Sequence, residues 1–302
     1  MFTEILELNF VQQGERLMIS RIRLVAATVA TGLLALSTST HAILLSNGTL
    51  SVDIDASNGA IASAVYSGSD YYNPGYPVSD WGLQAGTDTT TYRANTTRSS
   101  ADSIGVTVTS GTDSVDVSGT FSGVDFTRTY SLASGLDVLI TDTIFTNSTD
   151  GAVNIRYFDT FDPDQGSCCS TYNDVLTLNG AIVAQAVDNI TSLTSIIGDS
   201  SDETGFLTSG LAIDSGSVLN SFLAGTLSTD PDGALRDVGM AIAYDLTIGA
   251  GESISLSFLH AFGTSPRTAQ IAFTSAMVPE PSILALFGLG LAGLGLSRRK
   301  KA

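Results

Sequence analysis

The sequence predicts an all-β protein whose residues 43–277 form a single antiparallel β-sandwich. Three observations lead to this prediction. Apolar and polar residues alternate with a period of two through most of the region, as in strands that have one buried face. Short groups of Gly, Asp, Ser and Asn separate these stretches, and such residues favour turns. No stretch of the region has a convincing helical period with caps.

The N-terminal segment has the three parts of a secretory signal peptide. Two arginines precede an apolar run from Leu24 to Leu36, and small residues follow it up to Ala42, after which we expect cleavage. Residues 1–17 do not fit such a signal, whereas Met18 stands where one would begin. We therefore expect 1–42 to be the signal segment with its true start at Met18. A genuine N-terminal extension is the alternative.

The predicted strands share the alternation of apolar side chains and a turn signal at each end. They cover Leu50–Asp55, Ala60–Tyr66, Ile104–Thr109, Val115–Ser118, Leu136–Ile140, Val153–Phe161, Val175–Leu178, Ile182–Val187, Gly205–Ile213, Met240–Thr247 and Ile254–Phe262. About a dozen short strands in one region of this length are typical of a β-sandwich.

Aspartate dominates the charge of this region. Residues 43–277 contain 24 Asp and two Glu against six Arg and no Lys, a formal charge of −20. Such a charge argues against binding to nucleic acid or to anionic membranes. The apolar content is still high enough to build a core, so the composition is not that of a disordered chain.

The densest aromatic cluster consists of Tyr71, Tyr72, Tyr76 and Trp81. Exposed, these rings would stack on sugars and give a carbohydrate-binding surface. Buried, they would be ordinary core packing, which we favour because Trp and Tyr bury large areas. The run from Gly68 to Gly75 in this part of the chain resembles the large sandwiches of sugar-processing enzymes such as galactose mutarotase. That resemblance is one of general texture and assigns no catalytic residue.

Asp159, Asp162 and Asp164 lie on a segment with turn residues and place several oxygen donors close together in the sequence. Calcium requires such donors, and the turn with Asp230 and Asp232 repeats the chemistry. Neither turn has the spacing of an EF-hand loop. The alternative, which we favour, is plain turn chemistry on an acidic surface, with no metal or other cofactor.

The remaining candidates for chemistry are few. Cys168 and Cys169 are the only cysteines, and consecutive Cα atoms lie about 3.8 Å apart, below the usual disulfide range. The sequence leaves open a strained vicinal disulfide, free thiols and intermolecular pairing. His260 is the only histidine of the region and lies at the end of an alternating stretch, where a structural role is expected. No nucleophile or metalloprotease motif accompanies it, so we expect no catalytic activity.

The C-terminal tail, residues 278–302, combines three features in order. Pro279, Glu280 and Pro281 come first, and an apolar membrane segment follows at 282–297. The apolar part, Ile283 to Leu296, spans roughly 21 Å as a helix, against a hydrocarbon core of about 30 Å. It therefore fits a transient anchor better than a permanent one. The basic residues after it, which keep the C-terminus in the cytoplasm, are Arg298, Arg299, Lys300 and Lys301.

This tail resembles the PEP-CTERM sorting signal of exported proteins from Gram-negative bacteria that make extracellular polysaccharide. The resemblance implies recognition by an exosortase, an intramembrane enzyme that removes or replaces the tail. It also implies export by the Sec translocon and signal peptidase, a transient single-pass anchor in the inner membrane, and then a place at the cell surface or in the extracellular matrix. We therefore expect a non-catalytic envelope or matrix protein. The alternative is an extracellular carbohydrate-binding or carbohydrate-active protein, with polysaccharide as its partner.

Overall fold

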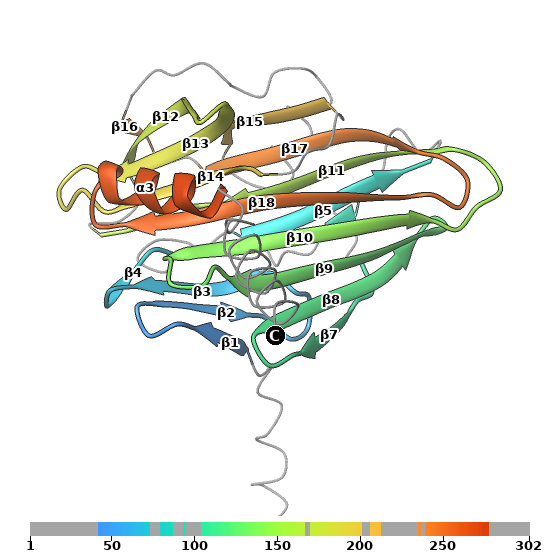
Figure 1. Cartoon of the computed structure of the whole chain (residues 1–302), viewed down its shortest axis with the longest axis horizontal. Coiled ribbons are helices and arrows are strands. Elements are labelled where there is room, and N and C mark those ends of the chain that lie inside the picture. Colours follow the sequence, from blue (N-terminus) through green and yellow to red (C-terminus); the bar gives the residue numbers. More distant parts are fainter. Residues whose placement is uncertain are drawn as a thin grey trace, which may run out of the picture. The chain divides into compact units, whose positions relative to one another are not determined.

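Antiparallel strands make up most of the chain that the computed structural model describes (Figure 1). The described residues are 42–72, 79–86, 93–94, 104–166, 170–200, 206–212, 235–236 and 239–277. The predicted signal peptide up to His41, the side chain of Tyr76, the two cysteines and the sorting tail lie outside them. In the described part of the chain, the strands form three sheets, and a helix follows the last strand.

The largest sheet has nine strands in the order β16-β12-β13-β14-β18-β10-β9-β8-β7. Its strands are β7 (Thr107–Ser110), β8 (Ser114–Phe121), β9 (Val124–Leu132), β10 (Val138–Asn147), β12 (Thr171–Leu178), β13 (Ala181–Asp188), β14 (Thr194–Asp199), β16 (Leu235–Arg236) and β18 (Ser253–Gly263). Every neighbouring pair is antiparallel. At the centre of the sheet β10 pairs with β18, so that Val138 lies opposite Ala261.

Two smaller antiparallel sheets complete the strand structure. The five-stranded sheet, in the order β15-β17-β11-β5-β6, contains β5 (Ser79–Ala85), β6 (Arg93–Ala94), β11 (Val153–Phe161), β15 (Phe206–Ala212) and β17 (Gly239–Ile248). The four-stranded sheet, in chain order, contains β1 (Ile43–Ser46), β2 (Leu50–Ile54), β3 (Ile61–Tyr66) and β4 (Ser69–Asp70).

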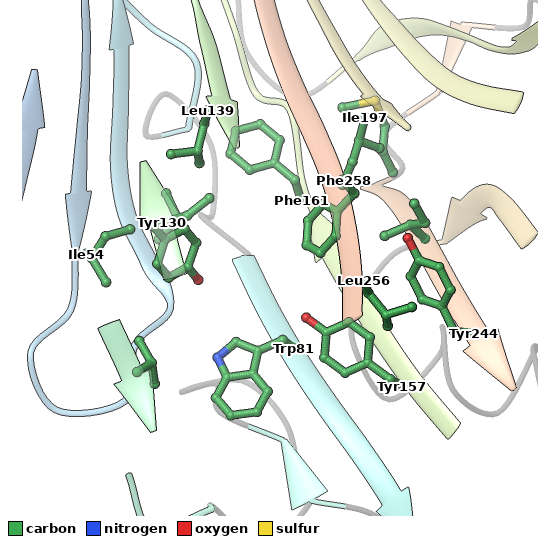
Figure 2. Close-up of a cluster of buried hydrophobic side chains, with 14 of the residues drawn as sticks. Ile54, Trp81, Tyr130, Leu139, Tyr157, Phe161, Ile197, Tyr244, Leu256 and Phe258 are labelled. Atoms are coloured by element: carbon green, nitrogen blue, oxygen red, sulfur yellow. The ribbon is translucent and has the colours of Figure 1, made fainter. Parts of the chain in front are cut away.

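Both smaller sheets pack on the same face of the nine-stranded sheet. Trp81 of β5 meets Phe126 of β9 with ring centroids 5.3 Å apart. The hydroxyl of Tyr130, also on β9, donates a hydrogen bond of 2.7 Å to the carbonyl oxygen of Gly59 in the β2–β3 connection. Side chains from all three sheets belong to one buried apolar cluster, part of which Figure 2 shows. The main core therefore lies between the nine-stranded sheet and the two smaller ones.

The opposite face of the nine-stranded sheet carries helix α3, Pro266–Met277, which corrects the expectation that residues 43–277 hold no helix (Figure 1). Only Ala269 and Phe273, one helical turn apart, are buried in it. They join a second apolar cluster with side chains of β10, β13, β14 and β18. A helix with two buried positions has too short an apolar stripe for its period to stand out in the sequence.

The predicted fold class is confirmed in its main statement, because the described residues are mostly antiparallel β. The finer statement needs one correction, because the domain ends in a helix, and one refinement, because the layer that faces the nine-stranded sheet is divided into two sheets. Most predicted strands coincide with observed ones within a few residues. The prediction at Leu136–Ile140 starts too early, because Leu136 belongs to a turn in which its amide donates to the carbonyl of Ala133.

Candidate functional site

A buried ion pair between Arg128 and Asp159 lies in the main core, between β9 of the nine-stranded sheet and β11 of the five-stranded one. Both side chains are nearly inaccessible to solvent, with exposed fractions of 2% and 4%. The Arg128 guanidinium also donates a hydrogen bond to the hydroxyl of Tyr157. That hydroxyl lies 3.4 Å from the Asp159 carboxylate, so the three groups form one polar network.

Aromatic rings enclose this network. The guanidinium carbon of Arg128 lies 4.6 Å from the ring centroid of Tyr130, 5.5 Å from that of Phe258 and 5.7 Å from that of Trp81. Figure 2 shows these three rings converging from different strands on the space between the sheets. Cation–π contacts of this kind stabilise a desolvated cation, and they explain how a single carboxylate suffices to balance Arg128 in the core.

Burial and charge set the pKa values of the network. Burial raises the pKa of Asp159 to about 6, although the attraction of Arg128 lowers it. Burial lowers the pKa of Arg128, but the carboxylate of Asp159 and the neighbouring tyrosines outweigh it and raise the pKa above its ordinary value. A carboxyl group with a raised pKa is a frequent sign of an active site. Here a general acid would need a route to substrate, and the rings leave both charges enclosed.

The predicted site residues included Asp159, as a calcium ligand, but not Arg128. Their burial could have been predicted from their positions in the alternation of buried and exposed residues along each strand. Arg128 falls on the same face of its strand as the buried Phe126 and Tyr130, and Asp159 on the same face as the buried Tyr157. A charged residue in the buried phase of each of two strands is expected to find its partner inside the core.

The described members of the aromatic cluster, for which stacking on sugars was one alternative, are packed in the core. Tyr71, Tyr72 and Trp81 are all buried, with exposed fractions of 0%, 5% and 1%. The hydroxyl of Tyr71 donates a 2.8 Å hydrogen bond to the carbonyl oxygen of Gly263 at the end of β18. The side chain of Tyr76 lies outside the described residues. The three described rings therefore offer no exposed face to a sugar.

The three aspartates considered for calcium point to different environments. Asp159 is paired with Arg128, whereas Asp162 and Asp164 are buried in the segment that follows β11. In the part of the chain that the structure describes, no group of three or more Asp, Glu, His or Cys residues is arranged to hold a metal ion. Asp230 and Asp232, where the sequence predicts a turn, lie outside that part, as do Cys168 and Cys169. Calcium binding at Asp159, Asp162 and Asp164 stays a prediction.

His260 forms a second buried polar pair, in β18, with Ser195 of the neighbouring strand β14. Its Nε2 atom lies 2.6 Å from the Ser195 hydroxyl, and both residues are buried. The rings of Phe161 and Phe262 lie against the imidazole, with centroids 4.1 Å and 4.4 Å away. Burial lowers the pKa of His260 to about 3, so the imidazole is neutral at physiological pH. Burial alone accounts for this shift, so no carboxylate acts on the imidazole as in a triad, and the surroundings are those of a packed core.

An open groove of about 470 Å³ lies where β1 approaches the β7–β8 and β9–β10 turns. Leu44, which is 59% exposed, forms an apolar part of its wall, and Asp113 is its one ionisable lining residue. The other lining residues are Leu45, Ser46, Asn47, Thr112, Leu132, Ala133, Ser134 and Gly135. The volume is within the range of small-molecule sites. Since Asp113 is its one ionisable residue, the groove could bind a neutral ligand, but it does not contain the pair of groups that acid–base catalysis requires.

No helix among the described residues has the length and apolar character needed to cross a membrane. The predicted membrane segment, 282–297, lies in the tail that the structure does not describe.

Comparison with solved structures gives matches at low sequence identity. A bacterial glucoamylase complexed with acarbose has a TM-score of 0.56 at 11% identity, over 78% of this chain and 33% of that one. A galactose mutarotase-like protein from Lactobacillus casei has 0.47 at 11%, over 74% and 100% of the two chains. A polysaccharide lyase has 0.45 at 14%, over 76% and 34%. The chain thus spans about a third of the glucoamylase, with which it shares a fold.

Comparison of the sequence with protein families gives one specific match. Among curated proteins none matches the chain. The family model of the PEP-CTERM protein-sorting motif matches residues 278–300. The match includes the Pro-Glu-Pro sequence, the apolar segment and the first basic residues, and it begins directly after helix α3. The chain therefore carries a C-terminal PEP-CTERM sorting motif, which marks it as an exported substrate of an exosortase.

Proposed function

We propose that this protein is a non-catalytic component of the cell envelope or extracellular matrix, delivered there by exosortase processing of its tail. One observation carries the non-catalytic half of this proposal. Asp159, whose pKa is raised to about 6, and His260, whose pKa is lowered to about 3, are both enclosed in the core and out of reach of a substrate. The described groove contributes Asp113 alone. A hydrolase or lyase needs at least two correctly placed groups in contact with substrate.

Intact-mass analysis of the protein from its native host tests the delivery half. We expect a mature form that begins at Ile43 and lacks the basic residues 298–301. Fractionation should place this form outside the cytoplasmic membrane. A protein that keeps Arg298 to Lys301 and stays in that membrane would refute the proposal.

An activity assay of the same material tests the non-catalytic half. The exported protein is incubated with the host's own extracellular polysaccharide, and new reducing ends, unsaturated products and chain length are followed. We expect no turnover. Release of products that disappears when the protein is heat-denatured would show an enzyme.

The groove favours a second candidate function, the binding of a neutral saccharide. Leu44 offers apolar surface for the C–H face of a sugar ring, while Asn47, Thr112, Asp113 and Ser134 surround it with polar groups. Retention on immobilised polysaccharide separates the two functions. For a binding protein, Leu44→Asp and Asp113→Ala should reduce retention at least tenfold. The matched control Ile190→Asp, at an exposed residue that does not line the groove, should leave it unchanged.

A further inference from the structure

Strand β1 leaves one of its edges free beside the groove of about 470 Å³. It is the outermost strand of the four-stranded sheet, and in the described part of the chain only β2 pairs with it. The amide of Asn47 donates to the carbonyl oxygen of Leu50 at 3.1 Å. Because bonded and non-bonded pairs alternate in an antiparallel ladder, Leu44 and Ser46 direct their amide and carbonyl groups away from β2. Both residues are exposed and line the groove, so these backbone groups face a ligand bound there.

Two turns of the nine-stranded sheet form the opposite wall of the groove. The β7–β8 turn contributes residues 112–113, and the β9–β10 turn contributes residues 133–135. Backbone hydrogen bonds of 2.8 Å and 2.9 Å close the two turns. The wall is therefore formed before a ligand arrives, which keeps the cost of ordering it on binding low.

Asn47 joins the two walls at one end of the groove. Its Nδ2 donates a hydrogen bond of 3.0 Å to the carbonyl oxygen of Leu136, the residue that directly follows the lining part of the β9–β10 turn. Its Oδ1 accepts hydrogen bonds from the amides of Thr49 and Leu50, at 3.0 Å and 2.8 Å, which hold the side chain in place. Where the walls are joined in this way, a ligand cannot pass between them. The groove is therefore closed at Asn47.

The order of the strands places Asp113 at the other end of the groove. Along this edge of the nine-stranded sheet, the start of β10 is followed by the end of β9 and the start of β8. Two strand spacings, about 10 Å, therefore separate Leu136 from Asp113. The chain from Asn47 back to Leu44 also spans about 10 Å. The groove thus runs along β1 from its closed end to an open end at Leu44 and Asp113, which are both exposed.

The groove suits an uncharged ligand that carries hydroxyl groups. A hydroxyl both donates and accepts, and the amide and carbonyl groups of Leu44 and Ser46 offer it partners of both kinds. The apolar side chain of Leu44 can cover the C–H face of a sugar ring. No Lys, Arg or His is among the lining residues, and Asp113 adds a negative charge to an acidic domain. An anionic saccharide is therefore repelled, and a neutral one is not.

We propose that the groove binds the end of an uncharged polysaccharide chain. The terminal sugar unit lies against Asn47, where the walls are joined, and the rest of the chain leaves past Asp113. An internal stretch of the same chain does not fit, because it would have to continue through the closed end. The protein therefore attaches to polysaccharide at chain ends and does not coat the length of the chain. This inference rests on the second candidate function, the binding of a neutral saccharide.

Competition between long and short chains tests the proposal. The exported protein from its native host is bound to the immobilised uncharged fraction of the host's extracellular polysaccharide, and the same fraction in solution displaces it. The competitor is used intact and after partial hydrolysis that raises the number of chain ends about tenfold at constant mass. A groove that binds ends predicts half-displacement at about a tenth of the mass of the hydrolysed sample. Equal masses would overturn the proposal, because internal stretches are almost equally abundant in the two samples.

Asn47→Asp tests the closed end. Aspartate keeps an Oδ1 for the amides of Thr49 and Leu50, but its carboxylate cannot donate to the carbonyl oxygen of Leu136. The end should open, and the ratio between the two competitors should fall from about ten towards one. Asn179→Asp is the matched control, because Asn179 also precedes a glycine in an exposed turn but does not line the groove. It should keep the wild-type ratio. A wild-type ratio in Asn47→Asp would overturn the assignment of Asn47 as the closed end.

Leu44→Asp shows whether the saccharide occupies this groove at all. The substitution replaces the exposed apolar side chain at the open end by a charge, and it should reduce retention at least tenfold. Retention at the wild-type level would place the saccharide elsewhere and overturn the proposal. Equal displacement by the anionic fraction of the polysaccharide would overturn the preference for an uncharged chain. A wild-type protein that the immobilised polysaccharide does not retain would instead refute the second candidate function itself.

Discussion

Two polar pairs are buried in the same sandwich, and they balance their burial in different ways. Arg128 and Asp159 join the nine-stranded and five-stranded sheets as opposite charges, with tyrosine and tryptophan rings around the cation. Ser195 and His260 join two adjacent strands as neutral groups. The first pair brings charge into the core and compensates it there, whereas the second avoids charge. Their responses to mutation and to pH should therefore differ in size and in sign.

The largest difference should appear when one partner of the charged pair is removed. Asp159→Leu leaves Arg128 charged and buried without a carboxyl oxygen to accept its hydrogen bond. A protonated Asp159 would still supply that oxygen, so the substitution should cost about 3–5 kcal/mol of unfolding free energy. The double variant Arg128→Met/Asp159→Leu removes both charges and keeps apolar volume, so it should recover most of the loss. Urea unfolding of the purified protein measures both. A double variant no more stable than the single one would show that the pair itself stabilises the core.

The neutral pair should respond mainly to pH. His260 has a pKa of about 3 when folded, against about 6.5 in an unfolded chain. Between these values only the unfolded chain binds the proton, so stability falls as the pH falls below 6.5. The loss should reach about 2 kcal/mol at pH 5 relative to pH 7. His260→Gln keeps a partner for Ser195 and should remove this loss. Subtracting the stability–pH curve of His260→Gln from that of the wild type isolates the contribution of His260, because the acidic surface is the same in both proteins.

The charged pair should contribute the opposite slope. Burial raises the pKa of Asp159 to about 6, above its value of about 3.9 in an unfolded chain. Between these values the folded protein binds the extra proton, so stability rises as the pH falls from 6 towards 4. In the His260→Gln background, which removes the contribution of the histidine, the protein that keeps Arg128 and Asp159 should gain stability between pH 6 and 5 relative to the variant that also carries Arg128→Met/Asp159→Leu. Parallel curves for the two would contradict the raised pKa.

The strands that carry these pairs also show which elements the alternation of residues does not reveal. Alternation located most strands, but β9 was missed although Val124, Phe126 and Tyr130 alternate in it, because Arg128 interrupts the apolar phase. Strand β14 was missed because both of its faces are covered, one by the main core and one by Phe273 of α3. Such a strand shows no alternation.

The sequence also does not reveal which residues far apart in the chain pair with each other. No local pattern indicates that Val138 lies opposite Ala261, or that Arg128 finds Asp159 across two sheets. The sorting motif was predicted correctly because it consists of a contiguous order of residues, which a single sequence displays directly. The candidate sites of the body depend on distant strands meeting, and a single sequence does not display that.

The smallest predicted effect compares two hydroxyl groups. Ser195→Ala leaves Nε2 of the buried His260 without its partner at 2.6 Å, which should cost about 1 kcal/mol or more. Thr146→Ala removes a contact of similar length, 2.8 Å, with Ser253 on the exposed face of the sheet. Water can replace that contact, so the cost should stay within about 0.5 kcal/mol. Urea unfolding at pH 7 measures both. Equal costs would mean that the imidazole is not isolated from solvent, and the low pKa of His260, with the acid sensitivity derived from it, would then have to be abandoned.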